Sequence, residues 1–142
     1  MIIIPFEPDH LKQIDLQNEQ STANDFMHNL DYIAALAAHE AWTGLIGGRI
    51  VACAGFVTIW AGRIQVWSVI SATIGARGMV MLTKAVLRGL ALKKGRVEAI
   101  VADNFKAGHR WAHLLGFTLE TPNPMRGYFP NGSDAFLYAR VK

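Results

Sequence analysis

A short glycine-containing segment, Gly75-Ala76-Arg77-Gly78, has the residue types and position that best suit chemistry. It lies between a stretch typical of a strand and an apolar-periodic stretch typical of a helix. Backbone N–H groups are open at a helix start and the helix dipole adds positive charge, so the segment predicts a phosphate or pyrophosphate site. It matches neither G-x-G-x-x-G nor a Walker loop, which disfavours nicotinamide cofactors and nucleoside triphosphates. A turn with a purely structural role is the alternative.

Two histidines, His109 and His113, lie one helical turn apart in a second predicted helix. Imidazole titrates near neutral pH and can act as an acid or a base. Partly solvated surface residues or core caps are the alternative interpretation of such a pair. Two ligands without a third do not make a metal site, so we expect no metal.

Hydrophobic periodicity and turn residues predict the elements that position these groups. The strands are expected over residues 1–6, 42–46, 49–60, 63–71, 96–102, 117–120 and 135–141. The helices are expected from Asp9 to about residue 18, from about Phe26 to about His39, and over residues 79–94 and 106–115. Gly47-Gly48 and Ala61-Gly62 are turn sequences that predict an antiparallel meander. The loop over residues 72–78 leads into the third helix, which is expected to end at Gly95.

Length and composition predict one domain over residues 1–142. A hydrophobic content of 51% with 18% charged residues suffices for a core. The net charge is +3, but the basic residues are scattered among 11 acidic ones, so we expect no nucleic-acid partner. The longest uncharged apolar stretch, residues 50–62, is too short to cross a membrane, and no secretory signal pattern precedes it. A single cysteine, Cys53, forms no intramolecular disulfide and is compatible with the cytoplasm.

The element order and local motifs resemble the GNAT superfamily of acyl-CoA-dependent N-acetyltransferases along nearly the whole chain. The family signature, Gln/Arg-x-x-Gly-x-Gly/Ala, corresponds to residues 75–80, which keep its middle glycine as Gly78. Asp103-Asn104 after a strand and Leu115-Gly116-Phe117 at the end of the last helix match further features. The resemblance implies a mixed α/β domain, with a mostly antiparallel sheet flanked by about four helices.

The resemblance also implies acetyl-CoA as cosubstrate. In the family, backbone amides of the loop and helix start hold the pyrophosphate, and the preceding strand pairs with the pantetheine arm. The residues so implied for CoA are Val69, Ile70, Ser71, Arg77, Gly78, Met79, Val80, Met81 and Asn104. Val80 places a branched side chain where the family keeps Gly or Ala so that phosphate can approach.

Family members often use a Glu on the strand before the loop as the base and a Tyr on the last helix as the acid. Ile64 aligns with the base, and Ala112 or Trp111 with the acid, so both groups are missing. The substitutes nearby are His113, His109 and Tyr128. Tyr128 lies in the loop that borders the acceptor in the family.

A second resemblance is to small GNAT-like proteins of tailed bacteriophages, some of which are internal virion components. It rests on Gly108-His109-Arg110-Trp111, on Leu115-Gly116-Phe117 and on Gly127-Tyr128-Phe129. Two hypotheses follow. The first is an N-acyltransferase that transfers acetyl from acetyl-CoA to a small-molecule or peptide amine in the cytoplasm. The alternative is a catalytically reduced structural or interaction protein, located in the virion if a phage encodes it.

Both hypotheses imply a V-shaped opening between the strands over residues 63–71 and 96–102. A homodimer is a candidate assembly, and no membrane partner is expected.

Overall fold

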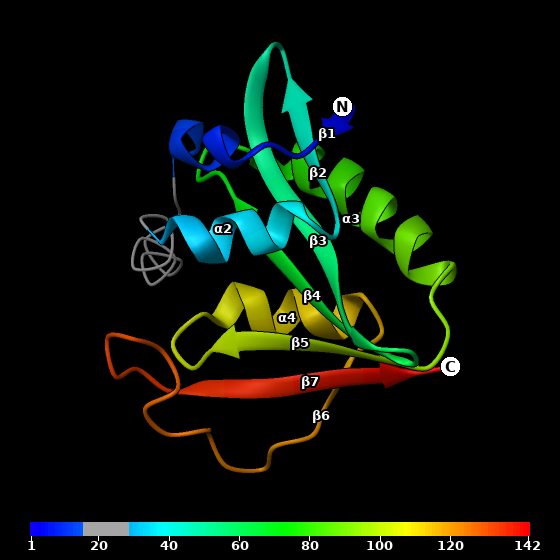
Figure 1. Cartoon of the computed structure of the whole chain (residues 1–142), viewed down its shortest axis with the longest axis vertical. Helices are drawn as coiled ribbons and strands as arrows, with labels where there is room; N and C mark the ends of the chain where they lie inside the picture. The colour runs from blue at the N-terminus through cyan, green and yellow to red at the C-terminus, as the bar shows by residue number, and fades with distance from the viewer. Residues whose placement is uncertain (16–28) are drawn as a thin grey trace.

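Helices cover both faces of one mixed sheet in the computed structural model, which describes residues 1–15 and 29–142 (Figure 1). The strands are β1 (Ile2–Pro5), β2 (Glu40–Ile46), β3 (Arg49–Trp60), β4 (Arg63–Ile70), β5 (Arg96–Ala102), β6 (Thr118–Leu119) and β7 (Ala135–Val141). The helices are η1 (Pro8–Gln13, a 3₁₀ helix), α2 (Leu30–Ala37), α3 (Gly75–Ala91) and α4 (Lys106–Leu114). Within the described residues the strand order is β1-β2-β3-β4-β5-β7-β6. The predicted mixed, mostly antiparallel α/β fold is confirmed.

The predicted meander is confirmed as β2, β3 and β4, which pair antiparallel in sequence order. Gly47 and Gly48 both have positive φ, 58° and 76°, as a primed two-residue turn requires. Strand β2 begins at Glu40, two residues before the predicted start, because Glu40 and Ala41 pair with Phe56 and Gly55 of β3.

The only parallel pair in the described part of the sheet joins β4 to β5, since α3 connects these strands across one face. The pairing is short. It runs from Arg63 opposite Arg96 to Val66 opposite Ala99 and then stops, although both strands continue. Figure 1 shows β4 and β5 diverging beyond this point. The predicted V-shaped opening between the two strands is therefore confirmed.

Two apolar clusters fix which helices lie on which face. Leu82, Val86 and Leu90 of α3 pack with Ala112 of α4 against one face of the sheet. On the other face, η1 and α2 contribute Leu11, Ile33 and Leu36, which pack against Cys53 and Val69. Figure 1 shows α2 on the side of the sheet opposite to α3 and α4. The sheet therefore separates two apolar clusters of different composition, and the opening between β4 and β5 lies between them.

The first two predicted helices are shorter than expected where the structure describes them. The first is the 3₁₀ helix Pro8–Gln13; its N-cap is Glu7 rather than Asp9, because the His10 ring accepts a hydrogen bond from the Glu7 amide. Its predicted end at residues 16–18 lies outside the described residues. The second helix begins at Leu30, where the Asn29 side chain caps the Tyr32 amide, and ends at Ala37. Its predicted first turn, residues 26–28, also lies outside the described residues.

Helix α3 begins at Gly75, four residues before the predicted Met79, and ends at Ala91 rather than Lys94. Gly75 has the positive φ of a turn residue, 72°, whereas Gly78 was a misleading loop signal. Gly78 is buried inside the helix, where a β-carbon would lie 2.6 Å from Ile74 Cγ1 and 3.1 Å from Ile46 Cδ1. Gly95 does not cap the helix; its amide and carbonyl pair with Lys142 at the end of the sheet. Gly78 and Gly95 therefore serve close packing and sheet pairing.

The last elements differ from the prediction only at their ends. The strand expected over residues 117–120 is reduced to Thr118–Leu119, and α4 ends at Leu114. Gly116, with φ of 87°, reverses the chain between α4 and β6, as its position after the helix predicts. None of the helices in the described part of the chain has the length and apolar character of a membrane span.

Candidate functional site

A cavity of about 490 Å³ lies in the opening between β4 and β5. Gln65, Trp67 and Val69 of β4 line it together with Tyr32 and Ile33 of α2 on one side of the sheet. On the other side, its walls are Val86 of α3 and the α4 residues Gly108, Trp111 and Ala112. The cavity therefore reaches both faces of the sheet.

Three amides of the loop between β4 and α3 already donate hydrogen bonds within the protein. The Ala72 amide donates to the Asp15 carbonyl at 2.7 Å, the Thr73 amide to Ser71 Oγ at 3.1 Å, and the Ile74 amide to the Ser71 carbonyl at 3.3 Å. These three donors cannot bind an anion without breaking the loop. The loop instead holds the start of α3 in a fixed position.

The first turn of α3 is where open amides lie. Its N-cap, Ile74, has no side-chain hydrogen bond to the helix, and the first turn contains no acidic residue. The amides of Gly75, Ala76 and Arg77 have no acceptor inside the helix by geometry, and all three residues are exposed. Open N–H groups and the positive end of a 17-residue helix favour an anion here.

The earlier helix start changes the position of the residues assigned to the pyrophosphate. Arg77 lies in the first turn and is exposed, as that role requires. Met79, Val80 and Met81 lie beyond the first turn, where helical amides donate to carbonyls four residues earlier. Val80 lies on the second turn and is 54% exposed. Gly78 faces the core, not the anion site.

The structure also separates the three residues assigned to the pantetheine arm from one another and from Asn104. Val69 lines the cavity. Ile70 packs in the core beneath α3, and the buried Ser71 donates its amide to the Val51 carbonyl of β3 at 2.8 Å. Asn104 is exposed in the turn between β5 and α4. Only Val69 among these four lines the cavity.

The strand positions that could carry a base hold no carboxylate. Ile64 packs against the core under α3, as its apolar side chain requires. Its neighbour Gln65 lines the cavity instead. The residue opposite Gln65 on β5 is Glu98, whose side chain is 8% exposed.

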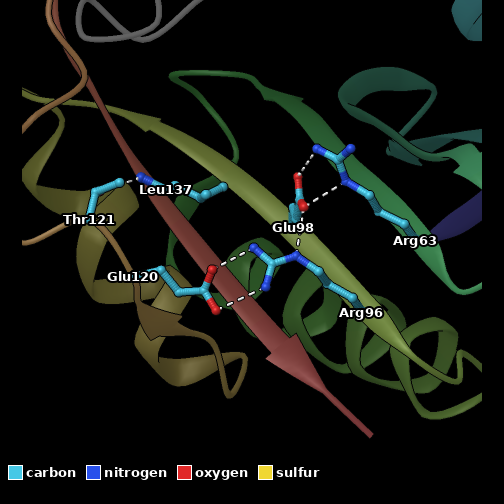
Figure 2. Close-up of polar contacts among 6 residues, drawn as sticks. All are labelled: Arg63, Arg96, Glu98, Glu120, Thr121 and Leu137. Atoms are coloured by element: carbon cyan, nitrogen blue, oxygen red, sulfur yellow. Dashed lines mark hydrogen bonds and ion pairs between the residues drawn. The ribbon is translucent and has the colours of Figure 1, made fainter.

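Figure 2 shows that Glu98 is held by two arginines. Arg63 donates to both carboxylate oxygens at 2.8 and 3.1 Å, and Arg96 donates to one of them at 2.7 Å. Arg96 also holds Glu120 in a two-point ion pair. The hydrogen bonds from Arg63, followed by those from Arg96, outweigh burial and lower the pKa of Glu98. Glu98 is therefore a poor base, and the network clamps the closed end of the V.

The positions expected for the acid hold no titratable group either. Ala112 is buried. The Trp111 indole N–H donates to Thr83 Oγ1 at 2.9 Å, and that hydroxyl donates to the Met79 carbonyl at 2.7 Å. This chain of hydrogen bonds joins α4 to α3 and leaves Trp111 as a wall of the cavity.

The two histidines lie against β7 and do not line the cavity. His109 Nε2 donates to the Asp103 carbonyl at 3.0 Å, and Nδ1 lies 2.8 Å from Tyr138 Oη. Both ring nitrogens of a neutral imidazole are thereby satisfied. His113 packs edge-on against the Tyr138 ring, with centroids 5.3 Å apart. This placement favours the structural interpretation of the pair.

We predict that neither histidine affects the pH dependence of turnover. His109→Ala should lower the free energy of unfolding by about 1 kcal/mol, because it removes hydrogen bonds to Tyr138 and Asp103. His113→Ala, at an exposed position, should cost less. Thermal unfolding and kcat/KM from pH 6 to 9 measure the two effects. A changed pH profile in either variant would restore histidine to the chemistry.

Tyr128 is the predicted catalytic candidate that the structure brings to the cavity. It comes from the loop between β6 and β7, where the Gly127 amide donates to Asp134 Oδ1 at 2.9 Å. Tyr32 of α2 lies near it; burial, followed by repulsion from Tyr128, raises the pKa of Tyr32. The two phenols are 46% and 43% exposed, which places them at the mouth of the cavity.

Cys53 is not available as a nucleophile. It is fully buried, and burial raises the pKa of its thiol to about 11 despite a hydrogen bond with Thr43. No group of three or more metal-ligating His, Cys, Asp or Glu side chains is found among residues 1–15 and 29–142.

Several site residues were not identified from the sequence. Gly75 and Ala76 belong to the segment predicted to bind an anion, but they were not assigned to the pyrophosphate because the helix start was placed too late. Tyr32, Gln65 and Trp67 reach the cavity from segments that resemble ordinary amphipathic elements. The one available signal was Gly55, because a β-carbon there would lie 2.8 Å from Trp67 Nε1. Gly55 leaves room for the Trp67 ring, which lies opposite it in the sheet register.

Solved structures share this architecture over almost their whole length. Ard1 from Thermoplasma volcanium matches with a TM-score of 0.77 at 14% identity, covering 99% of this chain and 96% of that one. A GNAT-family acetyltransferase from Bacillus anthracis matches with a TM-score of 0.65 at 16% identity, covering 98% and 93%. A GNAT superfamily phosphinothricin acetyltransferase from Sinorhizobium meliloti, solved in complex with AcCoA, matches with a TM-score of 0.67 at 15% identity, covering 98% and 86%.

No protein-family model and no curated protein sequence matches the chain. The likeness is therefore one of structure, and it covers nearly the whole chain. The chain has the fold of the GNAT acetyltransferases.

Proposed function

We propose that the protein is an acyl-CoA-dependent N-acyltransferase that uses acetyl-CoA and a primary amine. The observation that carries the proposal is the cavity between the diverging strands β4 and β5, which opens to both faces of the sheet. Such a passage lets a thioester enter from one side and an amine from the other. The GNAT fold of the chain, one of whose structural neighbours was solved with AcCoA, supports this assignment.

The residues present fit the CoA moiety at the start of α3. The amides of Gly75, Ala76 and Arg77 would donate to the pyrophosphate, with the Arg77 guanidinium adding a positive charge. The acyl end would lie in the opening beside Val69. Bound acetyl-CoA supplies an activated carbonyl, and the protein supplies its position beside the amine.

The reaction requires one proton to move from the amine to sulfur. The nitrogen attacks the thioester carbonyl, a C–N bond forms, the C–S bond breaks, and the nitrogen's proton ends on the departing thiolate. No carboxylate lines the cavity among the described residues, so the amine must arrive as its free base. The Tyr128 hydroxyl at the mouth is the side chain best placed to give a proton to the thiolate and regain it from the amine.

Calorimetric titration with acetyl-CoA and with CoA tests the first step. We expect binding of both. Release of free thiol from acetyl-CoA in the presence of primary amines, above the rate without protein, tests the second step. Absence of binding at millimolar acetyl-CoA would sink the proposal.

The alternative, a catalytically reduced GNAT-fold protein with a structural or interaction role in a phage particle, is favoured by one observation. The positions of the family's base and acid are held by Ile64 and by Ala112 or Trp111, and Glu98 is locked between arginines. Binding of CoA without any thiol release over a broad amine panel would favour this alternative. Turnover would reject it.

If the amine reacts as its free base, turnover should rise with pH. We expect kcat/KM to increase about tenfold per pH unit between pH 6 and 8, as the unprotonated fraction of an alkyl amine does. Burial already raises the pKa of Tyr32, so this phenol stays protonated over that range. Tyr128→Phe should lower kcat about 10- to 100-fold with the same slope. An unchanged kcat would remove Tyr128 from the proton transfer.

A further inference from the structure

Among the described residues, no charged side chain lines the compartment of the cavity on the α2 side. Resting on the function proposed above, we propose that the acceptor is a primary amine carried on an uncharged aromatic or alkyl body. Amino acids, whose carboxylate lies beside the amine, and polyamines are then poor acceptors.

The two faces of the sheet give the direction of approach. Helix α3 packs on the same face as α4, so its first turn places the CoA moiety on that side. The opposite end of the cavity is walled by α2 and by the loop between β6 and β7. This end is left for the acceptor.

The described walls of the acceptor compartment are mostly aromatic and aliphatic, and their polar groups, such as the Gln65 amide, are uncharged. They come from η1, α2, β4 and the loop between β6 and β7. The residues are Leu11, Tyr32, Ile33, Leu36, Trp67, Tyr128 and Phe129. None of the described residues that line the cavity, on either side of the sheet, is Asp, Glu, Lys, Arg or His. A cavity of about 490 Å³ with such walls suits a small apolar body beside the reacting group.

The nearest buried charge is neutralised within the protein. Glu98 lies opposite Gln65 in the sheet register, and Gln65 lines the cavity. The Glu98 carboxylate is shared by Arg63 and Arg96, and Arg96 is paired with Glu120. These four groups sum to zero charge. They offer neither a free carboxylate for a second ammonium nor a free guanidinium for a carboxylate.

A carboxylate on the acceptor would therefore lose water without gaining a cationic partner among the described lining residues. The same walls favour the neutral amine over its ammonium form. This preference provides part of what the missing base would otherwise supply, since an amine bound as its free base needs no deprotonation before attack.

Matched pairs of amines test the inference. Calorimetry should measure binding of 2-phenylethylamine and phenylalanine, which differ by one carboxylate, to the protein with and without CoA. Thiol release gives kcat/KM for both. We expect a preference of about 100-fold for 2-phenylethylamine. Pentylamine should likewise be preferred over 1,5-diaminopentane. We expect a smaller preference here, about tenfold, because the second ammonium can turn toward the open mouth and keep part of its water.

The outcomes separate this inference from the proposed function. Equal or better use of phenylalanine, or no binding of 2-phenylethylamine at millimolar concentration, overturns the inference even when acetyl-CoA binds. Selective binding of 2-phenylethylamine to a protein that does not bind acetyl-CoA supports the apolar compartment and rejects the acyltransferase.

A charge placed at the mouth should change the preference between pentylamine and the diamine. Tyr32 is the third residue of α2, where a carboxylate is compatible with the helix dipole, and its side chain is partly exposed. In Tyr32→Glu, the use of the diamine relative to pentylamine should rise about tenfold over that in Tyr32→Gln, the uncharged control of similar size. The ratio of the two kcat/KM values, determined by thiol release, measures this change. An identical ratio in the two variants would place the acceptor elsewhere.

Discussion

Ala76→Asp is expected to weaken acetyl-CoA binding by about 100-fold or more while leaving the fold intact. Ala76 is exposed in the first turn of α3, among the amides proposed to hold the pyrophosphate. A carboxylate there repels the diphosphate at close range. The same carboxylate stabilises the helix, because it lies at the positive end of the dipole. Loss of binding is thus uncoupled from loss of stability.

Two further variants at this position serve as controls. Ala76→Asn has the size of the aspartate without its charge and should bind acetyl-CoA within a few-fold of the wild type. Ala76→Lys should bind as well as the wild type or better. Dissociation constants come from calorimetry and stability from thermal unfolding. Equal affinity of the Asp and Asn variants would show that the anion does not bind at this helix start.

Glu98→Gln is expected to lower the free energy of unfolding by about 2 to 3 kcal/mol at neutral pH. Removing one partner of a buried ion pair costs about 3–5 kcal/mol. The arginines here are about a third exposed, at 35% and 30%, so solvent reduces the loss. Glu120→Gln is the matched control on the same network and should cost less, because Glu120 is 39% exposed and pairs with Arg96 alone.

The pH dependence of the same variant follows from the lowered pKa of Glu98. A carboxyl whose pKa is lower in the folded state stabilises the protein above its ordinary pKa of 4.5. That stability is lost as the pH falls below 4.5 through the folded-state pKa. The difference between wild type and Glu98→Gln in urea unfolding should therefore be constant above about pH 5.5 and shrink below about pH 4.5. A difference that grows on acidification would contradict the ion-pair account.

The strands were predictable from sequence because local signals dominate there. Arg49–Trp60, Arg96–Ala102 and Ala135–Val141 have the expected bounds, since β-branched residues and flanking turn residues define strand ends. The start of α3 was not predictable in this way. Gly75 and Gly78 are turn residues by type, but Gly78 lies inside the helix, where a β-carbon would meet first Ile74 and then Ile46 of β2. The second contact is one that no local pattern reveals.

The candidate site could be predicted only in part, for a related reason. The strand-loop-helix segment is defined by local signals and is present as predicted, and its role as an anion site stays a prediction. The acceptor compartment joins Tyr32, Trp67 and Tyr128, which are far apart in sequence. Conversely, the spacing of His109 and His113 suggested chemistry, but their orientation is decided by Tyr138 on a strand 29 residues after His109. Side-chain spacing defines a helix face, and tertiary packing decides what that face contacts.

The central proposal is that CoA binds at the start of α3 and reaches into the opening between β4 and β5. Amide chemical shifts in a ¹H–¹⁵N spectrum, followed during a titration with CoA, test it most directly. We expect the largest changes at Gly75, Ala76 and Arg77, with Val69 also affected, and none at residues 92–95 beyond the other end of the helix. Saturable binding with these first-turn amides unmoved, or no change at millimolar CoA, would contradict this placement of CoA.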